Sequence, residues 1–260
     1  YIIKIDTCLG ASCVYTNVMV NKIMKNTLFI IFTLSVLNGF SQIFDDMEIE
    51  NDSLIKPWIE SDINNYEGVY FYGISEGESI VTLAIENDKI DLQVSNSGSE
   101  IYYNGQFAGW ERNIENYTNI SINGNKFYSD QSDGEFVTYK GIKCLKLEKP
   151  PIDLYDEKYE LGEINRKPKE TYFSGNYIST KFELLNSQKL QSVSLQELKI
   201  MRNEIFARYG YKFKDGGQMN EYFKNQDWYT TSNLDINNCL TTIEKANIEI
   251  IKKIEKEKKP

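Results

Sequence analysis

The sequence predicts an α+β protein, with an N-terminal antiparallel β barrel or sandwich followed by a small, mostly α-helical region. Short runs of alternating apolar and polar residues follow one another between Tyr66 and Glu148, which is typical of strands. After Ser194 the apolar residues recur at helical spacing. Between these stretches, residues 149–170 carry three prolines and a dense mixture of charges, which indicates a linker.

Composition narrows the classes of function. The 260 residues are enough for one large or two modest globular domains. Lys and Arg total 29 against 38 Asp and Glu, a net charge of -9, so the chain lacks the basic footprint of a general nucleic-acid-binding protein. The chain contains no histidine, which excludes Ser-His and Cys-His nucleophile pairs, His-ligated metals and imidazole proton shuttles.

Residues 24–41 have the pattern of a secretory signal peptide. Lys25 follows Met24, the stretch from Leu28 to Leu37 is largely apolar, and small residues stand at Gly39 and Ser41. A transmembrane anchor is the alternative, but this stretch is about half of the roughly 20 residues needed to span a bilayer. We expect cleavage after Ser41, residues 1–23 to be translated from upstream of the true start, and a mature chain without a membrane span. The protein is then exported, to the periplasm or the extracellular medium.

The mature chain begins with an expected flexible acidic leader, residues 42–65, which has little periodicity. The β domain is expected over residues 66–148, with six to eight strands joined by tight turns. Its clearest strands are Val69–Tyr72, Ile80–Ile85, Ile90–Val94, Tyr117–Ile122, Phe136–Tyr139 and Ile142–Leu147. Turn signals separate them, including Glu86-Asn87-Asp88, Asn104-Gly105, Asn123-Gly124 and Asp133-Gly134. The many Tyr and Phe residues of this domain either fill its core, the favoured interpretation, or line a ligand cavity.

The two halves of the mature chain have opposite net charge. Residues 42–170 carry a net charge of -14, and residues 171–260 carry +3. The basic half is therefore suited either to dock against the acidic half or to face an anionic envelope polymer.

The C-terminal region, residues 171–260, is expected to contain three helices. Ser194 and Glu197 have capping-box spacing at the start of a helix that runs to Tyr209, and Gly210 is suited to end it. A second, shorter helix holds Met219, Tyr222 and Phe223 on one side. Thr241 and Glu244 form another capping box, ahead of the helically spaced apolar residues Ile243, Ala246, Ile250, Ile251 and Ile254.

These C-terminal residues resemble the YARHG domain. The resemblance rests on the run from Met201 to Phe213, on Tyr222-Phe223 and Trp228-Tyr229, and on Leu240 to Ile251, and it covers about residues 172–256. The chain departs from the family's name motif twice, with Phe206 in place of the first Tyr and Tyr209 in place of the His. The resemblance implies a small, exported, mostly helical bacterial module found beside extracellular or envelope domains, and it does not imply an enzyme.

Four side chains of this region are candidate binding residues: Arg202, Arg208, Trp228 and Tyr229. An arginine fork and aromatic faces suit carboxylated sugars or peptide stems. The favoured interpretation is structural, because Glu204 and Arg208 have the four-residue spacing at which a carboxylate meets a guanidinium on a helix. The aromatic pair then covers the core.

No motif indicates catalytic residues, a metal site or a cofactor. Phosphate loops, dinucleotide fingerprints, nucleophile elbows and zinc-ligand pairs are absent from the sequence. The acidic clusters Glu76-Gly77-Glu78 and Asp130 to Asp133 are expected in solvated turns. Two mature cysteines, Cys144 and Cys239, either pair or remain free. The preferred function is a noncatalytic binding module for an envelope polymer or protein partner, and the alternative is a carboxylate-based hydrolase acting on cell-wall glycan.

Overall fold

The structure is a computed structural model that describes residues 52–72, 79–87, 89–103, 106–149, 160–165 and 172–259. The expected upstream extension, the signal peptide and the first part of the acidic leader lie outside these ranges, as do the turn at Asn104-Gly105 and the acidic cluster from Glu76 to Glu78. None of the described helices combines the length and the apolar character needed to cross a bilayer.

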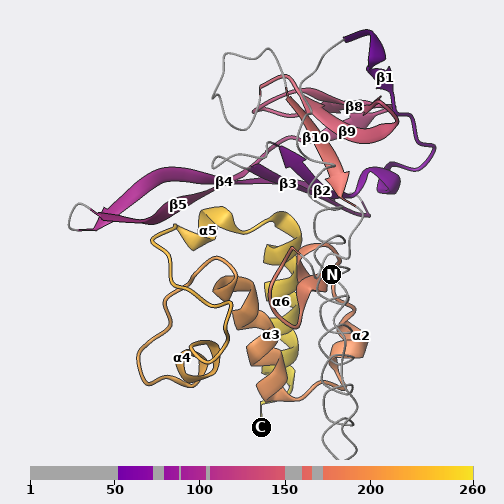
Figure 1. Cartoon of the computed structure of the whole chain (residues 1–260). Helices are drawn as coiled ribbons and strands as arrows, with labels where there is room; N and C mark the ends of the chain where they lie inside the picture. The colour runs from indigo at the N-terminus through magenta and orange to yellow at the C-terminus, as the bar shows by residue number, and fades with distance from the viewer. Residues whose placement is uncertain are drawn as a thin grey trace, which may run out of the picture. The chain divides into compact units, whose positions relative to one another are not determined.

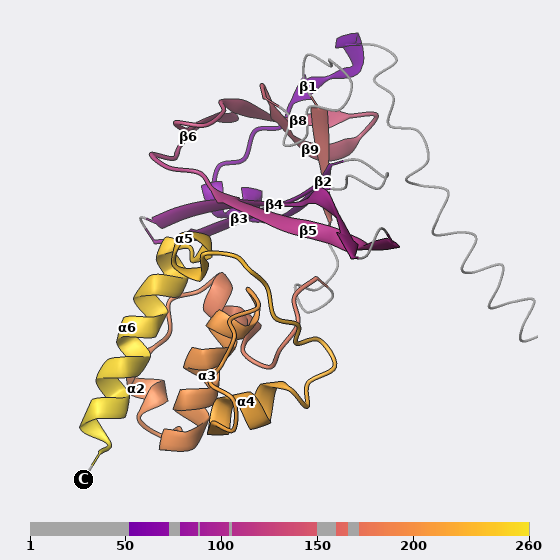
Figure 2. The same cartoon turned by 90° about the vertical axis from the view of Figure 1, so that its left-hand side faces the viewer.

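Ten antiparallel strands form one curved sheet, in the strand order β5-β4-β3-β2-β10-β9-β8-β7-β6, with β1 beside β8. This is a half-barrel, which confirms the α+β class and the antiparallel arrangement expected from the alternating runs. Figure 2 shows the sheet curling so that its two halves face each other. The strands are β1 (Lys56–Pro57), β2 (Gly68–Tyr72), β3 (Ser79–Glu86), β4 (Lys89–Tyr103), β5 (Gln106–Asn116), β6 (Ser121–Asn123), β7 (Lys126–Tyr128), β8 (Gly134–Tyr139), β9 (Ile142–Leu147) and β10 (Glu160–Asn165).

The space inside the curl is filled by aromatic and aliphatic side chains. Tyr70, Tyr72, Phe127 and Phe136 are at most 1% exposed, and they pack with alternate residues of β3, β4 and β9. The Tyr72 hydroxyl donates to the backbone carbonyl of Leu145 at 2.6 Å, so burial of this ring leaves no orphaned donor. These aromatics therefore form the core of the sheet, as the favoured interpretation of the sequence predicted.

The acidic leader is structured over its second half, contrary to expectation. Trp58 is buried beneath the sheet at 4% exposure, and the Tyr66 hydroxyl donates to its backbone carbonyl at 3.1 Å. Lys56 and Pro57 pair with β8. The acidic side chains around Trp58 suggested a solvated segment, but the apolar area of one indole is enough to fix a short segment against a core.

Two further expectations about the strands need correction. Within residues 149–170, which were expected to be a linker, strand β10 pairs with both β2 and β9. Its short length and its charged, proline-rich flanks hid it in the sequence. The expected strand from Tyr117 to Ile122 begins only at Ser121, because Tyr117 turns inward and its backbone N–H donates to the Leu92 carbonyl at 2.9 Å.

Helices α3 and α6 pack against each other and form the centre of the helical region (Figure 1). The α-helices are α2 (Ser187–Leu190), α3 (Leu195–Ala207), α4 (Gln218–Phe223), α5 (Ile236–Cys239) and α6 (Thr242–Glu257), and the 3-10 helices are η1 (Asp52–Leu54), η2 (Ile63–Tyr66) and η4 (Ile178–Lys181). The three expected helices correspond to α3, α4 and α6. Helix α3 ends two residues earlier than predicted, and Gly210 follows it with φ +77°, the left-handed conformation expected of a residue beyond a helix end.

The capping box at Thr241 and Glu244 is present with both reciprocal hydrogen bonds. At the start of α3 only half of the expected box forms. The Ser194 hydroxyl accepts from the Glu197 N–H at 3.1 Å, whereas the Glu197 carboxylate accepts from the Tyr177 hydroxyl at 3.2 Å. The second box was therefore predicted correctly and the first was predicted only in part.

The helical region covers the outer face of the layer formed by β2, β3, β4 and β5 (Figures 1 and 2). Val69 and Ala84 of the sheet share an apolar cluster with Ile178, Phe182 and Ile243. Both faces of this layer are therefore covered, and the polar residues on its outer face become buried between sheet and helices.

Cys144 and Cys239 are free and buried. Burial raises the pKa of Cys144 to about 12, with a further contribution from the Glu163 carboxylate, and burial also raises the pKa of Cys239. Of the two possibilities left open by the sequence, the structure supports separate free thiols.

Candidate functional site

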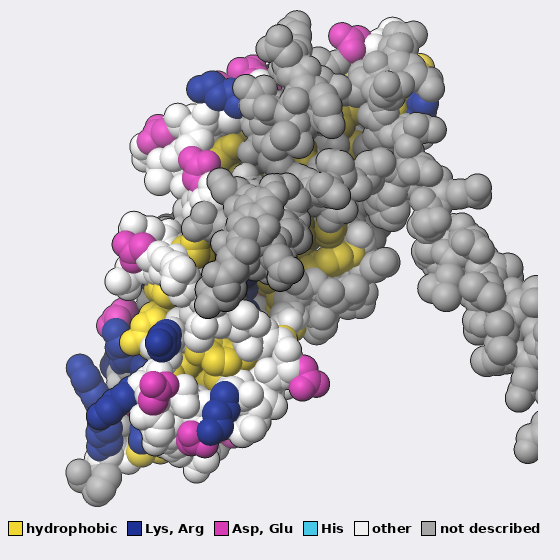
Figure 3. Space-filling view, turned by 60° about the vertical axis from the view of Figure 1, so that its left-hand side comes forward, with side chains coloured by type: hydrophobic (Ala, Val, Ile, Leu, Met, Phe, Trp, Pro, Cys, Tyr) yellow, Lys and Arg dark blue, Asp and Glu magenta, His cyan; other side chains and the backbone are white. Residues whose placement is uncertain are grey.

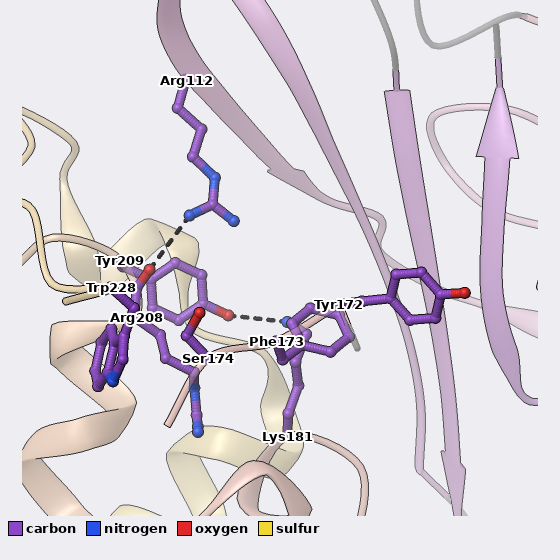
Figure 4. A pocket seen from close by; sticks show the side chains of 8 residues that line it. All are labelled: Arg112, Tyr172, Phe173, Ser174, Lys181, Arg208, Tyr209 and Trp228. Atoms are coloured by element: carbon purple, nitrogen blue, oxygen red, sulfur yellow. Dashed lines mark hydrogen bonds between the residues drawn. The ribbon is translucent and has the colours of Figure 1, made fainter. Parts of the chain in front are cut away.

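A cavity of about 140 Å³ opens at the junction between the sheet and the helical region. Among the described residues that line it, three side chains are basic and none is acidic. Figure 4 shows Arg112 reaching from the sheet toward Arg208, Tyr209 and Lys181 of the helical region, whereas the Tyr172 ring points away from them. The lining residues are Arg112, Tyr172, Phe173, Ser174, Lys181, Arg208, Tyr209 and Trp228.

Arg208 caps the C-terminal end of α3 and is held by groups on three sides. Its Nη1 donates to the Glu204 carboxylate and to the Tyr177 carbonyl, both at 3.3 Å, which confirms the predicted pair of Glu204 and Arg208. Its Nη2 donates to the Thr180 hydroxyl at 2.6 Å and lies 3.6 Å from a carboxylate oxygen of Glu244. The Arg208 Nε is buried and has no hydrogen-bond partner among the described residues.

The Glu204 carboxylate connects α3 to the segment before η4. Its two oxygens accept the backbone N–H groups of Asn176 and Tyr177 at 2.9 and 2.8 Å. Gly175 precedes these residues with φ +114°, and a Cβ there would collide with the same carboxylate. The close approach of this backbone therefore requires a glycine, and it places Phe173 and Ser174 in the cavity wall.

Lys181 is the innermost basic group of the cavity, at 3% exposure. Its Nζ donates to Gln93 Oε1 at 2.7 Å and to the Tyr209 hydroxyl at 3.1 Å. Burial lowers its pKa to about 8; Arg208 and Arg112 act in the same direction, and Glu244 and Asp91 oppose it. Lys181 therefore loses its proton more readily than an exposed lysine, but it is still mostly protonated at neutral pH.

Tyr209 connects this lysine to the start of α6. Its hydroxyl donates to the Glu244 carboxylate at 2.6 Å, and the same oxygen of Glu244 accepts the Thr241 N–H at 3.1 Å as part of the capping box. Burial, with the neighbouring Glu244, raises the pKa of Tyr209 well above its usual value, so the hydroxyl keeps its proton. The position that carries His in the family's name motif here holds a neutral hydrogen-bond relay between a lysine and a carboxylate.

Arg112 reaches the cavity from the sheet and is the most exposed of the three basic side chains. Its Nη1 donates to the backbone carbonyl of Arg208 and its Nε to the Ser95 hydroxyl, each at 3.2 Å. Figure 4 shows the side chain extending from its strand toward the helical region. Arg112 therefore bridges the two parts of the molecule while using few of its five N–H groups.

The four candidate binding residues do not form one patch. Arg208 and Trp228 line the cavity. Arg202 instead pairs with Glu255 of α6, with Nε 3.0 Å from the carboxylate. The Tyr229 hydroxyl donates to the Tyr211 carbonyl at 2.6 Å, and the ring packs in an aromatic cluster with Phe213 and Phe223. The structural interpretation therefore describes the contacts of Arg202 and Tyr229.

Sequence reasoning missed Arg112 and Lys181. Arg112 belongs to the acidic half of the chain, and Lys181 lies within residues 172–256 but ahead of the run from Met201 to Phe213. One usable signal existed for Lys181, which is the only charged residue between Tyr172 and Phe182. A single charge in such a stretch indicates either a solvated turn or a paired buried group, and the sequence alone does not distinguish them.

Each of two wider grooves carries one basic and one acidic side chain among its described lining residues. One, of about 400 Å³, is lined by Trp58, Glu60, Asn65, Lys143 and Ile164, and Lys143 and Glu60 neutralise each other at 2.7 Å. The other, of about 420 Å³, lies beside Tyr211 and carries one basic and one acidic side chain, Lys212 and Asp235. Across the described ranges, no group of three or more Cys, Asp or Glu side chains is placed to hold a metal ion.

The fold and the cavity define an α+β protein in which a curved antiparallel sheet and a helical region jointly enclose a basic site. Residues 172–256 match the YARHG domain family, so the C-terminal helical region is a YARHG domain. Comparison of the chain with curated proteins and with solved structures gave no match.

Proposed function

We propose that the protein is an exported, noncatalytic binding protein of the bacterial envelope or extracellular space, and that its ligand is an anionic envelope polymer. The observation that carries the proposal is the cavity at the junction, where the charged side chains among the described lining residues are all basic. Such a site attracts and orients negatively charged groups. A protein partner is the other class of ligand suited to this surface.

Export is supported by the signal-peptide pattern of residues 24–41 and by the YARHG domain. The surface of that domain adds to the electrostatic argument. Figure 3 shows basic side chains gathered on the helical region near the C-terminal end of the chain, and exposed lysines of α6 lie there. These exposed positive charges also attract a negatively charged polymer to the helical region.

Binding is favoured over glycan hydrolysis by the engagement of the nearby acids. Hydrolysis needs two carboxylates flanking the scissile bond, one of them able to donate a proton. Glu204 and Glu244 are the buried acids closest to the cavity, but Glu204 holds two backbone N–H groups and Glu244 belongs to the capping box. Both also face Arg208, and neither lines the cavity. These two carboxylates serve the structure of the site.

The test is co-sedimentation of the purified protein with insoluble peptidoglycan at low and physiological salt. We expect the protein to pellet with the polymer, and Arg112→Gln to reduce the bound fraction at least fivefold. Lys126→Gln is the matched control, because it removes one exposed positive charge from β7 without touching the cavity. Absence of pelleting, or equal pelleting of both variants, would contradict the proposal.

A further inference from the structure

We propose that the cavity holds one carboxylate group of the ligand, with the rest of the ligand projecting from the opening. The inference rests on the proposed binding function and specifies the chemical group that is recognised. A carboxylate is available on a peptide stem and on an acidic sugar, and both sources share the same planar monoanion.

Two basic side chains of the cavity keep hydrogen-bond donors without a partner among the described residues. The Arg208 Nε is buried without a partner, although both Nη atoms of the same guanidinium are engaged. An unmade hydrogen bond from a buried charged group is costly, so this N–H indicates a place for an acceptor. Lys181 uses two of its ammonium hydrogens on Gln93 and Tyr209. The third remains for a ligand, because a protonated lysine has three donors.

Basic and acidic side chains both lie around the cavity. Arg112, Lys181 and Arg208 bring three positive charges, and Glu204 and Glu244 bring two negative charges in contact with Arg208. Among the described residues, Asp91 is the remaining nearby acid, and it accepts the Thr242 and Ile243 N–H groups at the positive end of α6. The three carboxylates balance the three basic side chains, but each carboxylate accepts protein N–H groups and none lines the cavity, so the described lining presents only positive charge. A bound monoanion adds one negative charge to this largely buried site and a phosphate dianion adds two, so the monoanion is favoured.

The size and shape of the cavity suit a small group. A cavity of about 140 Å³ has room for a small group such as a carboxylate with its adjoining carbon atoms. In the view of Figure 4, Trp228 and Phe173 lie on opposite sides of the Arg208 side chain. These rings offer apolar surface to the carbon atoms next to the carboxylate.

The experiment is isothermal titration calorimetry of the full chain with four small probes at constant ionic strength. We expect N-acetylglycine and glucuronate to bind, the neutral N-acetylglycinamide to give no signal, and inorganic phosphate to bind at least tenfold more weakly than the carboxylates. The relative affinities of the first two probes distinguish the peptide source from the sugar source. Arg112→Gln should weaken carboxylate binding at least tenfold, Arg112→Lys should restore part of it, and Lys126→Gln should leave it unchanged.

Phosphate binding as tight as carboxylate binding would overturn the inference, and so would equal binding of N-acetylglycine and its amide. Amidation of the carboxyl groups of peptidoglycan separates this failure from failure of the proposed function. If native and amidated polymer pellet the protein equally, and Arg112→Gln weakens both, the carboxylate assignment fails and the polymer-binding function stands. If the small carboxylates bind while neither polymer pellets the protein, the site is supported and the polymer is the wrong ligand.

Discussion

The sheet and the helical region bury their polar groups in opposite ways. Inside the curled sheet, the core is made of aliphatic and aromatic side chains, and the hydroxyls of Tyr66, Tyr70 and Tyr72 donate to backbone carbonyls. In and beneath the helical region, the buried side chains include Lys181, Glu204, Glu244, Asn247 and Glu255. The interior of the curled sheet is thus apolar, whereas the helical region combines an apolar cluster around Leu198, Ile205 and Ile251 with a buried charged network.

This difference indicates which region of the molecule can bind a ligand. An apolar core is stabilised by close packing, and it leaves no hydrogen-bond donors of fixed direction for a ligand. A buried charged network holds groups in fixed directions, and any donor it leaves unpaired is available for recognition. The charged network lies at the junction of the two regions, and the cavity opens in the same place. Three substitutions test whether the network is structural and whether it depends on the sheet.

The largest effect is expected from Arg208→Ala. This change leaves Glu204 and Glu244 without their shared cation in a buried site, so the free energy of unfolding should fall by about 3 kcal/mol or more. Arg202→Ala is the matched control, because its pair with Glu255 is partly exposed and should contribute about 1 kcal/mol or less. Urea unfolding measures both. An equally small loss of stability in both variants would show that Arg208 and its two carboxylates are not shielded from water.

The next effect concerns pH and Lys181. In the unfolded chain this lysine keeps its proton up to about pH 10.5, whereas in the folded protein its pKa is lowered to about 8. Between these values the unfolded state binds more protons, so the contribution of Lys181 to stability rises as the pH increases. Relative to Lys181→Met, the wild-type protein should gain on the order of 2 to 3 kcal/mol from pH 7 to pH 10.5. A difference between the two proteins that is flat across this window would contradict the lowered pKa.

The smallest of the three effects tests the contact between sheet and helix. Asp91 of β4 accepts the N–H groups of Thr242 and Ile243 at 3.0 and 2.8 Å, so a sheet residue caps α6. Asp91→Ala should destabilise the protein by about 1 to 2 kcal/mol and speed amide hydrogen exchange in the first turn of α6. Ser194→Ala removes the exposed cap of α3 as a control, and faster exchange should then be confined to α3. Unchanged exchange in α6 after Asp91→Ala would mean that the helix does not depend on the sheet.

The sequence predicted the helices and strands whose positions follow from local patterns of apolar and capping residues. The apolar runs that became β2, β3, β8 and β9 were readable because each strand has a face in the aromatic core, and β2 and β3 also pack their other face against the helical region. The start of α6 was readable because a capping box is local to four residues. Strand β10 and the segment around Trp58 were not readable, because each is held by partners distant in the sequence.

The site was less predictable than the fold for the same reason. Glu204 and Arg208 are four residues apart on one helix, so their pairing follows from helix geometry. Asp91 and Gln93 occupy the polar face of an alternating strand, which would ordinarily face water. The helical region covers that face, so Gln93 accepts from Lys181 across 88 positions of sequence. Periodicity identifies which face of a strand is polar, but it does not show what covers that face.

The central claim is that the basic cavity at the junction binds the ligand, and the arginine Nε–H signals in nuclear magnetic resonance spectra test it most directly. The chain has four arginines, Arg112, Arg166, Arg202 and Arg208, so their Nε–H signals can be assigned by single substitutions. On titration with N-acetylglycine, the account predicts shifts of the Arg112 and Arg208 signals, because these side chains line the cavity. The Arg202 signal should remain in place, because its Nε already donates to Glu255. Shifts of Arg202 with Arg112 and Arg208 unmoved would contradict the account.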